Sequence, residues 1–218
     1  MENVYSYADV LESYMIAEEG LGDAIKKAGS KIVSVLKGLK DKIVQFFQKI
    51  VASIKSKLAK REKSEKKDPP SRGGQYAIFN LCLNDMQKSL GCLSKAIGAS
   101  RTVNDTGDDD VQKQIEYFNE FIDKADERID RESEWTVLDS KIIDGLVKRA
   151  ESIKNTFMQE VDLAIRVVDA SHYNMAQNAR HLSPQLANQI CSANSKFLKT
   201  YSNLLRHLEF CSSTGDMK

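Results

Sequence analysis

Apolar residues recur at steps of three and four along most of the chain, the spacing that places them on one face of a helix. The first run extends from Leu21 to about Leu58 and predicts one long amphipathic helix. Four further runs predict four more helices, at Tyr76–Ile97, Val111–Ile129, Trp135–Val168 and Leu186–Leu208. No β-type alternation of useful length interrupts them. The pattern therefore predicts an all-α protein.

The breaks between these runs define the predicted organisation of the chain. Residues 59–75 are charged, then contain Pro-Pro and Gly-Gly, and a double proline cannot continue a helix. Ser183-Pro184 is a favoured helix start, with an N-cap followed by proline in the first turn. We expect four segments: an acidic leader at 1–19, a long basic amphipathic N-terminal helix at 20–60, a flexible linker at 61–75, and an antiparallel four-helix bundle at 76–218.

Charge is strongly segregated near the N-terminus. Residues 1–20 hold five acidic and no basic side chains, for a net charge of −5. Residues 21–67 hold fourteen Lys and Arg against four acidic side chains, for +10. The remaining 151 residues carry 18 basic and 22 acidic side chains, for −4. The total of +1 therefore conceals an acidic leader joined to a basic amphipathic helix.

The lysines of the long helix are the candidate binding residues, and three interpretations of this helix stay open. Its apolar stripe packs on the chain's own bundle or on a second copy. Alternatively, the helix lies on an anionic membrane surface, or its lysines neutralise the phosphates of DNA without sequence specificity. The candidate polyanion-binding residues are Lys26, Lys27, Lys31, Lys37, Lys40, Lys42, Lys49, Lys55 and Lys57.

Signals of catalysis and of bound cofactors are missing from the sequence. The common nucleotide-binding, hydrolase and metalloprotease motifs do not occur, and the three histidines lack partners at ligand spacing. Asp108–Asp110 lacks the alternating ligands of a calcium loop and is interpreted as a helix-capping cluster. Trp135 is interpreted as a core anchor and the four cysteines as reduced thiols. We expect a non-enzymatic protein without cofactor or metal.

The end of the leader carries a family resemblance. Residues 17–20 read Ala17-Glu18-Glu19-Gly20, at the boundary between the acidic and the basic segment. This leader resembles the capsid-targeting propeptides of internal head proteins of large contractile-tailed bacteriophages. Those propeptides end at a glutamate, and a prohead protease cleaves directly after it. Two positions before this glutamate stands a small or aliphatic residue, with any residue in between. Two registers fit, ending at Glu18 or Glu19, and the second is favoured because Gly20 follows the cut.

The resemblance implies a location and a set of partners. It implies a non-enzymatic virion-internal protein that is targeted to the prohead and packaged with DNA or ejected alongside it. Its partners would be the prohead protease and capsid or core proteins, with the host cytoplasm as its location during assembly or after ejection. Cleavage after Glu19 would remove five acids and leave a product of about +6, because +10 and −4 remain.

Two alternatives remain. The leader can instead be an amphipathic helix over Val4–Ile16 that caps the rest of the protein. The protein can instead be a membrane-surface-associating effector or adaptor, which keeps an intact chain and binds a protein partner through its helical bundle.

Overall fold

Five helices make up the described part of the chain. The computed structural model describes residues 21–63, 73–100, 108–132, 135–173 and 184–213. The helices are α2 (Leu21–Lys63), α3 (Gly73–Ala99), α4 (Asp108–Arg131), α5 (Ser140–Tyr173) and α6 (Pro184–Cys211). No strand occurs within these ranges, so the prediction of an all-α fold is confirmed. The predicted leader and most of the predicted linker lie outside the described residues.

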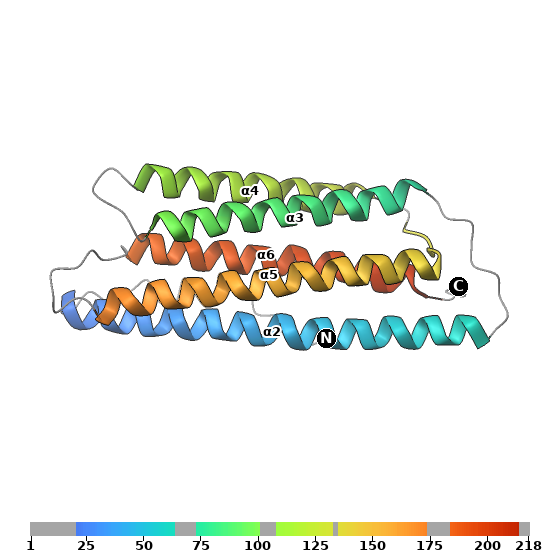
Figure 1. Ribbon diagram of the computed structural model, residues 1–218, viewed down its shortest axis with the longest axis horizontal. Coiled ribbons are helices and arrows are strands. Elements are labelled where there is room, and N and C mark those ends of the chain that lie inside the picture. Colours follow the sequence, from blue (N-terminus) through green and yellow to red (C-terminus); the bar gives the residue numbers. More distant parts are fainter. Residues whose placement is uncertain (1–20, 64–72, 101–107, 133–134, 174–183, 214–218) are drawn as a thin grey trace.

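The helices lie side by side in an elongated bundle, and successive helices alternate in direction (Figure 1). Helix α2 packs on α5 and α6, whereas α4 packs on α3 and α6. Helices α2 and α4 therefore form opposite edges of the bundle (Figure 1). The middle of the bundle holds α3, α5 and α6, each of which contacts helices on both sides.

Helix α2 belongs to the same hydrophobic core as the other four helices. Its stripe residues Leu36, Leu39 and Ile43 are completely buried, and the core cluster that contains them continues into α5 and α6. The structure thus differs from the predicted arrangement of a basic helix beside a four-helix bundle. The physical reason is that hydrophobic periodicity identifies a face to be buried but does not identify the surface that covers it.

The start of α5 also differs from the sequence-based prediction. Trp135 precedes the helix in a non-helical segment, and α5 begins at Ser140. The side chain of Asp139 accepts hydrogen bonds from the backbone N–H groups of Lys141 (2.8 Å) and Ile142 (3.3 Å), which is the geometry of an N-cap. The predicted start of α6 at Pro184 is confirmed.

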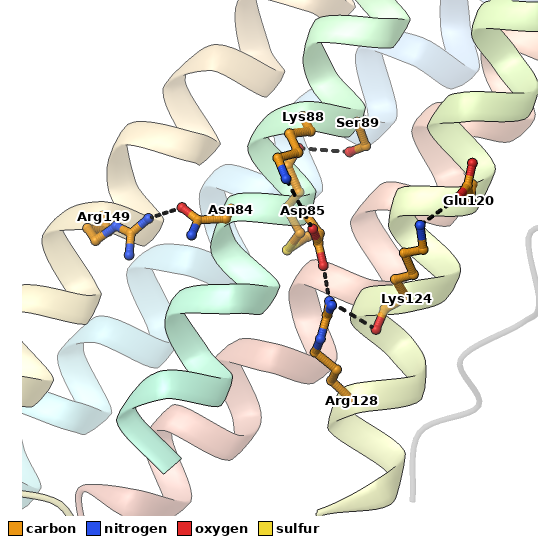
Figure 2. A network of polar contacts seen from close by, with 9 residues as sticks. Asn84, Asp85, Lys88, Ser89, Glu120, Lys124, Arg128 and Arg149 are labelled. Carbon is orange, nitrogen blue, oxygen red and sulfur yellow. Dashed lines mark hydrogen bonds and ion pairs between the residues drawn. The ribbon is translucent and has the colours of Figure 1, made fainter. Parts of the chain in front are cut away.

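A polar network on α3 fixes its orientation between α4 and α5. Figure 2 shows the buried carboxylate of Asp85, which accepts a charged hydrogen bond from Arg128 of α4. On the other side of α3, Arg149 of α5 donates to Asn84 at 2.8 Å and also to Asn80. Because a buried carboxylate without a partner is costly, the first contact strongly favours one register of α3 against α4.

Candidate polyanion-binding surface

Two of the predicted polyanion-binding lysines hold α2 in the bundle. The Lys40 Nζ lies 2.8 and 2.7 Å from the two carboxylate oxygens of Asp162 on α5. The Lys57 Nζ lies 3.2 Å from a carboxylate oxygen of Glu209 on α6 and 3.3 Å from its backbone carbonyl. Both ammonium groups are half-buried within ion pairs. These lysines therefore serve packing between helices and are poorly placed for an external polyanion.

Glu209 is the centre of the contact between α2 and α6. Burial raises the pKa of its carboxyl, but hydrogen bonds from Ser53 and Lys57, with the charges of Lys57 and Lys49, outweigh burial. Its pKa therefore lies below the ordinary value for glutamate. Near the end of α2, the buried Arg61 donates to the backbone carbonyl of Leu138 at 2.9 Å. Polar contacts thus join α2 to the bundle on both sides of its apolar stripe.

The remaining described candidates are exposed. Five of the predicted lysines have exposed side chains, namely Lys31, Lys37, Lys42, Lys49 and Lys55.

Three of these lysines form one row together with Lys60. We call Lys31, Lys42, Lys49 and Lys60 the lysine row, and all four are exposed. They follow one another at steps of 11, 7 and 11 residues, which are close to three, two and three helical turns. The row therefore runs straight along one flank of α2 for about 44 Å, at 1.5 Å per residue. Lys60 was missed by the sequence-based selection, although its 11-residue spacing from Lys49 is visible in the sequence.

Some predicted site residues lie outside the described part. Lys26 and Lys27 fall on α2, but their side chains are not among those described. The predicted cleavage residues Ala17, Glu18, Glu19 and Gly20 lie wholly outside the described residues. Cleavage of the leader therefore stays a prediction.

The apolar face of α2 is covered in the folded protein. Besides the aliphatic stripe, Phe47 is buried beneath the Lys154 ammonium, which lies 4.6 Å from its ring centroid. Phe46 is half-buried, with the guanidinium carbon of Arg206 at 5.8 Å from its ring. Along residues 30–63, most of the exposed side chains of α2 are polar or basic. Membrane association through an apolar helix face would require this helix to leave the bundle.

Across the described helices, no segment has the length and apolar character needed to span a membrane.

The described part of the chain contains no cluster of three or more His, Cys, Asp or Glu side chains able to hold a metal ion. All four cysteines are free thiols, in agreement with the prediction. Burial raises the pKa of three buried cysteines, and these are Cys82 and Cys191 at about 11 and Cys211 at about 12. Cys92 is only half-buried, and burial raises the pKa of its thiol as well. Thiols held protonated in this way are poor nucleophiles and poor metal ligands.

Trp135 lies in an aromatic cluster between helices. Its ring stacks on His207 of α6 with centroids 4.6 Å apart and tilts against Phe79 of α3 at 4.9 Å. Burial in this cluster lowers the pKa of His207, while the charge of Asp130 opposes the shift. The interpretation of Trp135 as a packing anchor fits these contacts.

Comparison with known protein families gives a match over the first third of the chain. The family model of phiKZ-like phage internal head proteins matches residues 2–73. No curated protein and no solved structure shows a significant match. The matched segment contains residues 2–19 of the acidic leader and all of α2, and so includes the lysine row and both lysines that bind α5 and α6. The first third of this chain is thus similar to internal head proteins of large phages, and the match supports the resemblance to that class of protein but does not test cleavage of the leader.

Proposed function

We propose that this protein is a non-enzymatic component of a phage head interior, directed into the prohead by residues 1–19 and matured by cleavage after Glu19. The observation that carries this proposal is the match to phiKZ-like internal head proteins over residues 2–73. That match spans the candidate propeptide and the helix that follows it. The acidic leader and the favoured Ala17-Glu18-Glu19-Gly20 register supply the recognition and cleavage sequence.

In the mature protein, the lysine row contacts packaged DNA through its phosphates. Four exposed lysines on one flank of α2 suit a long, uniformly charged polyanion better than a compact ligand. Removal of five acids raises the net charge of the protein from +1 to about +6, which strengthens this attraction. The membrane-surface alternative is weakened because α2 uses its apolar face inside the bundle.

The mass and N-terminal sequence of the protein recovered from particles test the first part. Maturation predicts a chain that begins at Gly20, and substitution of both Glu18→Gln and Glu19→Gln predicts a full-length product in particles. A particle-derived wild-type chain that still begins at Met1 would refute the cleavage.

Salt-dependent DNA binding tests the second part. If all four row lysines contact phosphates, the logarithm of the affinity for duplex DNA falls with the logarithm of salt concentration, and this row contributes about −3.6 to the slope. A variant with Lys31, Lys42, Lys49 and Lys60 changed to Gln should lose that contribution.

The matched control changes the same number of exposed lysines on other helices to Gln, at Lys95, Lys141, Lys148 and Lys199. Both variants lose four positive charges, so a difference between them reports position and not net charge. Equal loss of DNA binding in the two variants would contradict a role for the row.

A further inference from the structure

A short non-helical segment crosses one end of the bundle. Figure 1 shows that α2 ends, α3 begins, α5 begins and α6 ends at this same end of the molecule. Residues 135–139 lie there, directly before α5, and none of them is helical. We call this segment the clasp, because its residues contact α2, α3 and α6.

Both backbone groups of Leu138 are bound by other helices. Its carbonyl accepts a hydrogen bond from the guanidinium of Arg61 on α2 at 2.9 Å, and its N–H donates to the backbone carbonyl of Cys211 on α6 at 2.9 Å. Leu138 is completely buried and Arg61 is only 6% exposed. Because this contact is buried, water has little access to replace the guanidinium as a donor.

The first two residues of the clasp are bound to α3 and α6. The side-chain oxygen of Gln75, in the first turn of α3, accepts hydrogen bonds from the Thr136 backbone N–H at 3.2 Å and from the Thr136 hydroxyl at 2.9 Å. Gln75 is buried as well. The ring of Trp135 packs against both Phe79 of α3 and His207 of α6. The clasp therefore joins the end of α2 to the start of α3 and the end of α6.

We propose that the clasp couples the position of α2 to the ends of α3 and α6. If Arg61 is withdrawn with α2, the buried Leu138 carbonyl loses a charged donor, and a buried acceptor without a donor is costly. Movement of the clasp relieves this cost by bringing the carbonyl into water. Because Thr136 is two residues from Leu138, the same movement separates Thr136 from Gln75 and pulls Trp135 away from its aromatic neighbours.

Such a coupling acts in both directions, because the free energy that links two sites is the same from either side. A weaker contact between Thr136 and Gln75 therefore loosens the hold of the clasp on Arg61 and on the last turns of α2. Arg61 lies inside the segment that matches internal head proteins, whereas Gln75 and the clasp lie after it. A displacement of α2 is thus transmitted to the part of the chain outside the match.

Hydrogen exchange of the full-length protein, followed by mass spectrometry, tests the coupling. Arg61→Met removes the guanidinium and keeps an unbranched side chain. We expect backbone amides at residues 75–82 and 205–212 to exchange about tenfold faster, since a hydrogen bond from a charged donor is worth at least about this factor. Both of these segments lie on helices other than the one that carries the substitution.

The reciprocal variant is Thr136→Val, which removes the hydroxyl donor to Gln75 and nearly preserves the shape of the side chain. The backbone amides at residues 57–63 of α2 should then exchange about threefold faster, because one neutral hydrogen bond is lost. The matched control is Arg131→Met, four residues before Trp135. It removes an exposed guanidinium whose ion pair with Glu127 is local to α4, and it should leave all three segments at the wild-type rate.

Two outcomes would overturn the proposal. In the first, Arg61→Met speeds exchange on α2 and at Leu138 alone while Thr136→Val speeds exchange on α3 alone, so that each contact is local. In the second, exchange rises uniformly and includes residues 115–125 in the middle of α4, which means that the whole bundle unfolds without a separate movement of the clasp. If circular dichroism shows that Arg61→Met does not fold, Thr136→Val alone decides between these outcomes and the coupling.

Discussion

A core substitution on α2 tests whether this helix belongs to the cooperative fold. Leu39 is completely buried in the core shared with α5 and α6. Leu39→Ala removes three carbon atoms, worth about 2.4 kcal/mol at about 0.8 kcal/mol per buried carbon. The cavity that remains adds to this loss, and comparable substitutions cost about 2–5 kcal/mol. We therefore expect the free energy of unfolding to fall by about 3 kcal/mol, a urea midpoint shift of about 1–2 M.

Two optical probes separate α2 from the rest of the bundle. Far-ultraviolet circular dichroism reports all helices, whereas fluorescence of Trp135, the only tryptophan, reports its contacts with Phe79 and His207. Leu39 and Arg61 are 22 residues apart, or about 33 Å along α2. Arg61 contacts the segment next to Trp135, so the substitution is far from the fluorescent probe. If the five helices unfold together, Leu39→Ala shifts both transitions equally.

The control is Gln48→Ala, at an exposed position of the same helix, which should change stability by less than about 0.5 kcal/mol. The reasoning is refuted if Leu39→Ala leaves the Trp135 transition in place while part of the circular dichroism signal is lost at lower urea. That result would mean that α2 unfolds from a bundle of residues 76–218 that is stable without it.

Three further predictions concern titratable groups. Cys92 should react with a thiol reagent at pH 8 well before the three buried cysteines, whose burial and raised pKa protect them until the protein unfolds, as counted by mass spectrometry. Burial raises the pKa of Glu160, and one of its carboxylate oxygens is buried without a hydrogen-bond partner. Glu160→Gln should therefore raise the thermal midpoint at pH 7 but not at pH 4, where the wild-type carboxyl is largely protonated. An equal change in the midpoint at both pH values would contradict this. The pKa of Glu209 is lowered in the folded state. The stabilisation from the ionised Glu209 is therefore complete above the unfolded pKa and is lost as pH falls through the folded pKa. Lys57→Met, which removes its ion-pair partner, should destabilise the protein more at pH 7 than at pH 3 in urea titrations.

The sequence was sufficient for the number of helices but not for the start of α5 or for the neighbours of α2. Strict three- and four-residue steps predict each helix, and the Ser183-Pro184 start of α6 follows from local chemistry alone. The partner surface of α2 depends on contacts more than 100 residues away, such as Lys40 with Asp162. Hydrophobic periodicity contains no information about such pairs, because it describes one helix at a time.

The division of the lysines was partly visible in the sequence. Lys40 directly follows the core residue Leu39, and Lys57 directly precedes Leu58, so both lie at the border of the apolar stripe. Lysines at such a border can bury their alkyl stems and pair across to the next helix. The straight lysine row requires only the helical repeat, and counting 11- and 7-residue steps would have added Lys60. The acidic partners of Lys40 and Lys57, in contrast, could be found only from the fold.

The packing of α2 against α5 and α6 has a consequence for synthesis of the protein. The ribosome completes α2 first, but α6 ends 148 residues after Lys63. At about 5–20 residues per second, the apolar stripe of α2 waits for about 7–30 s before its last partner exists. Throughout that time the apolar stripe of α2 lacks the surfaces that cover it in the folded protein, and the many lysines around it oppose aggregation. The segment translated immediately before this helix carries a net charge of −5, so opposite charge is present next to the lysines from the start of synthesis.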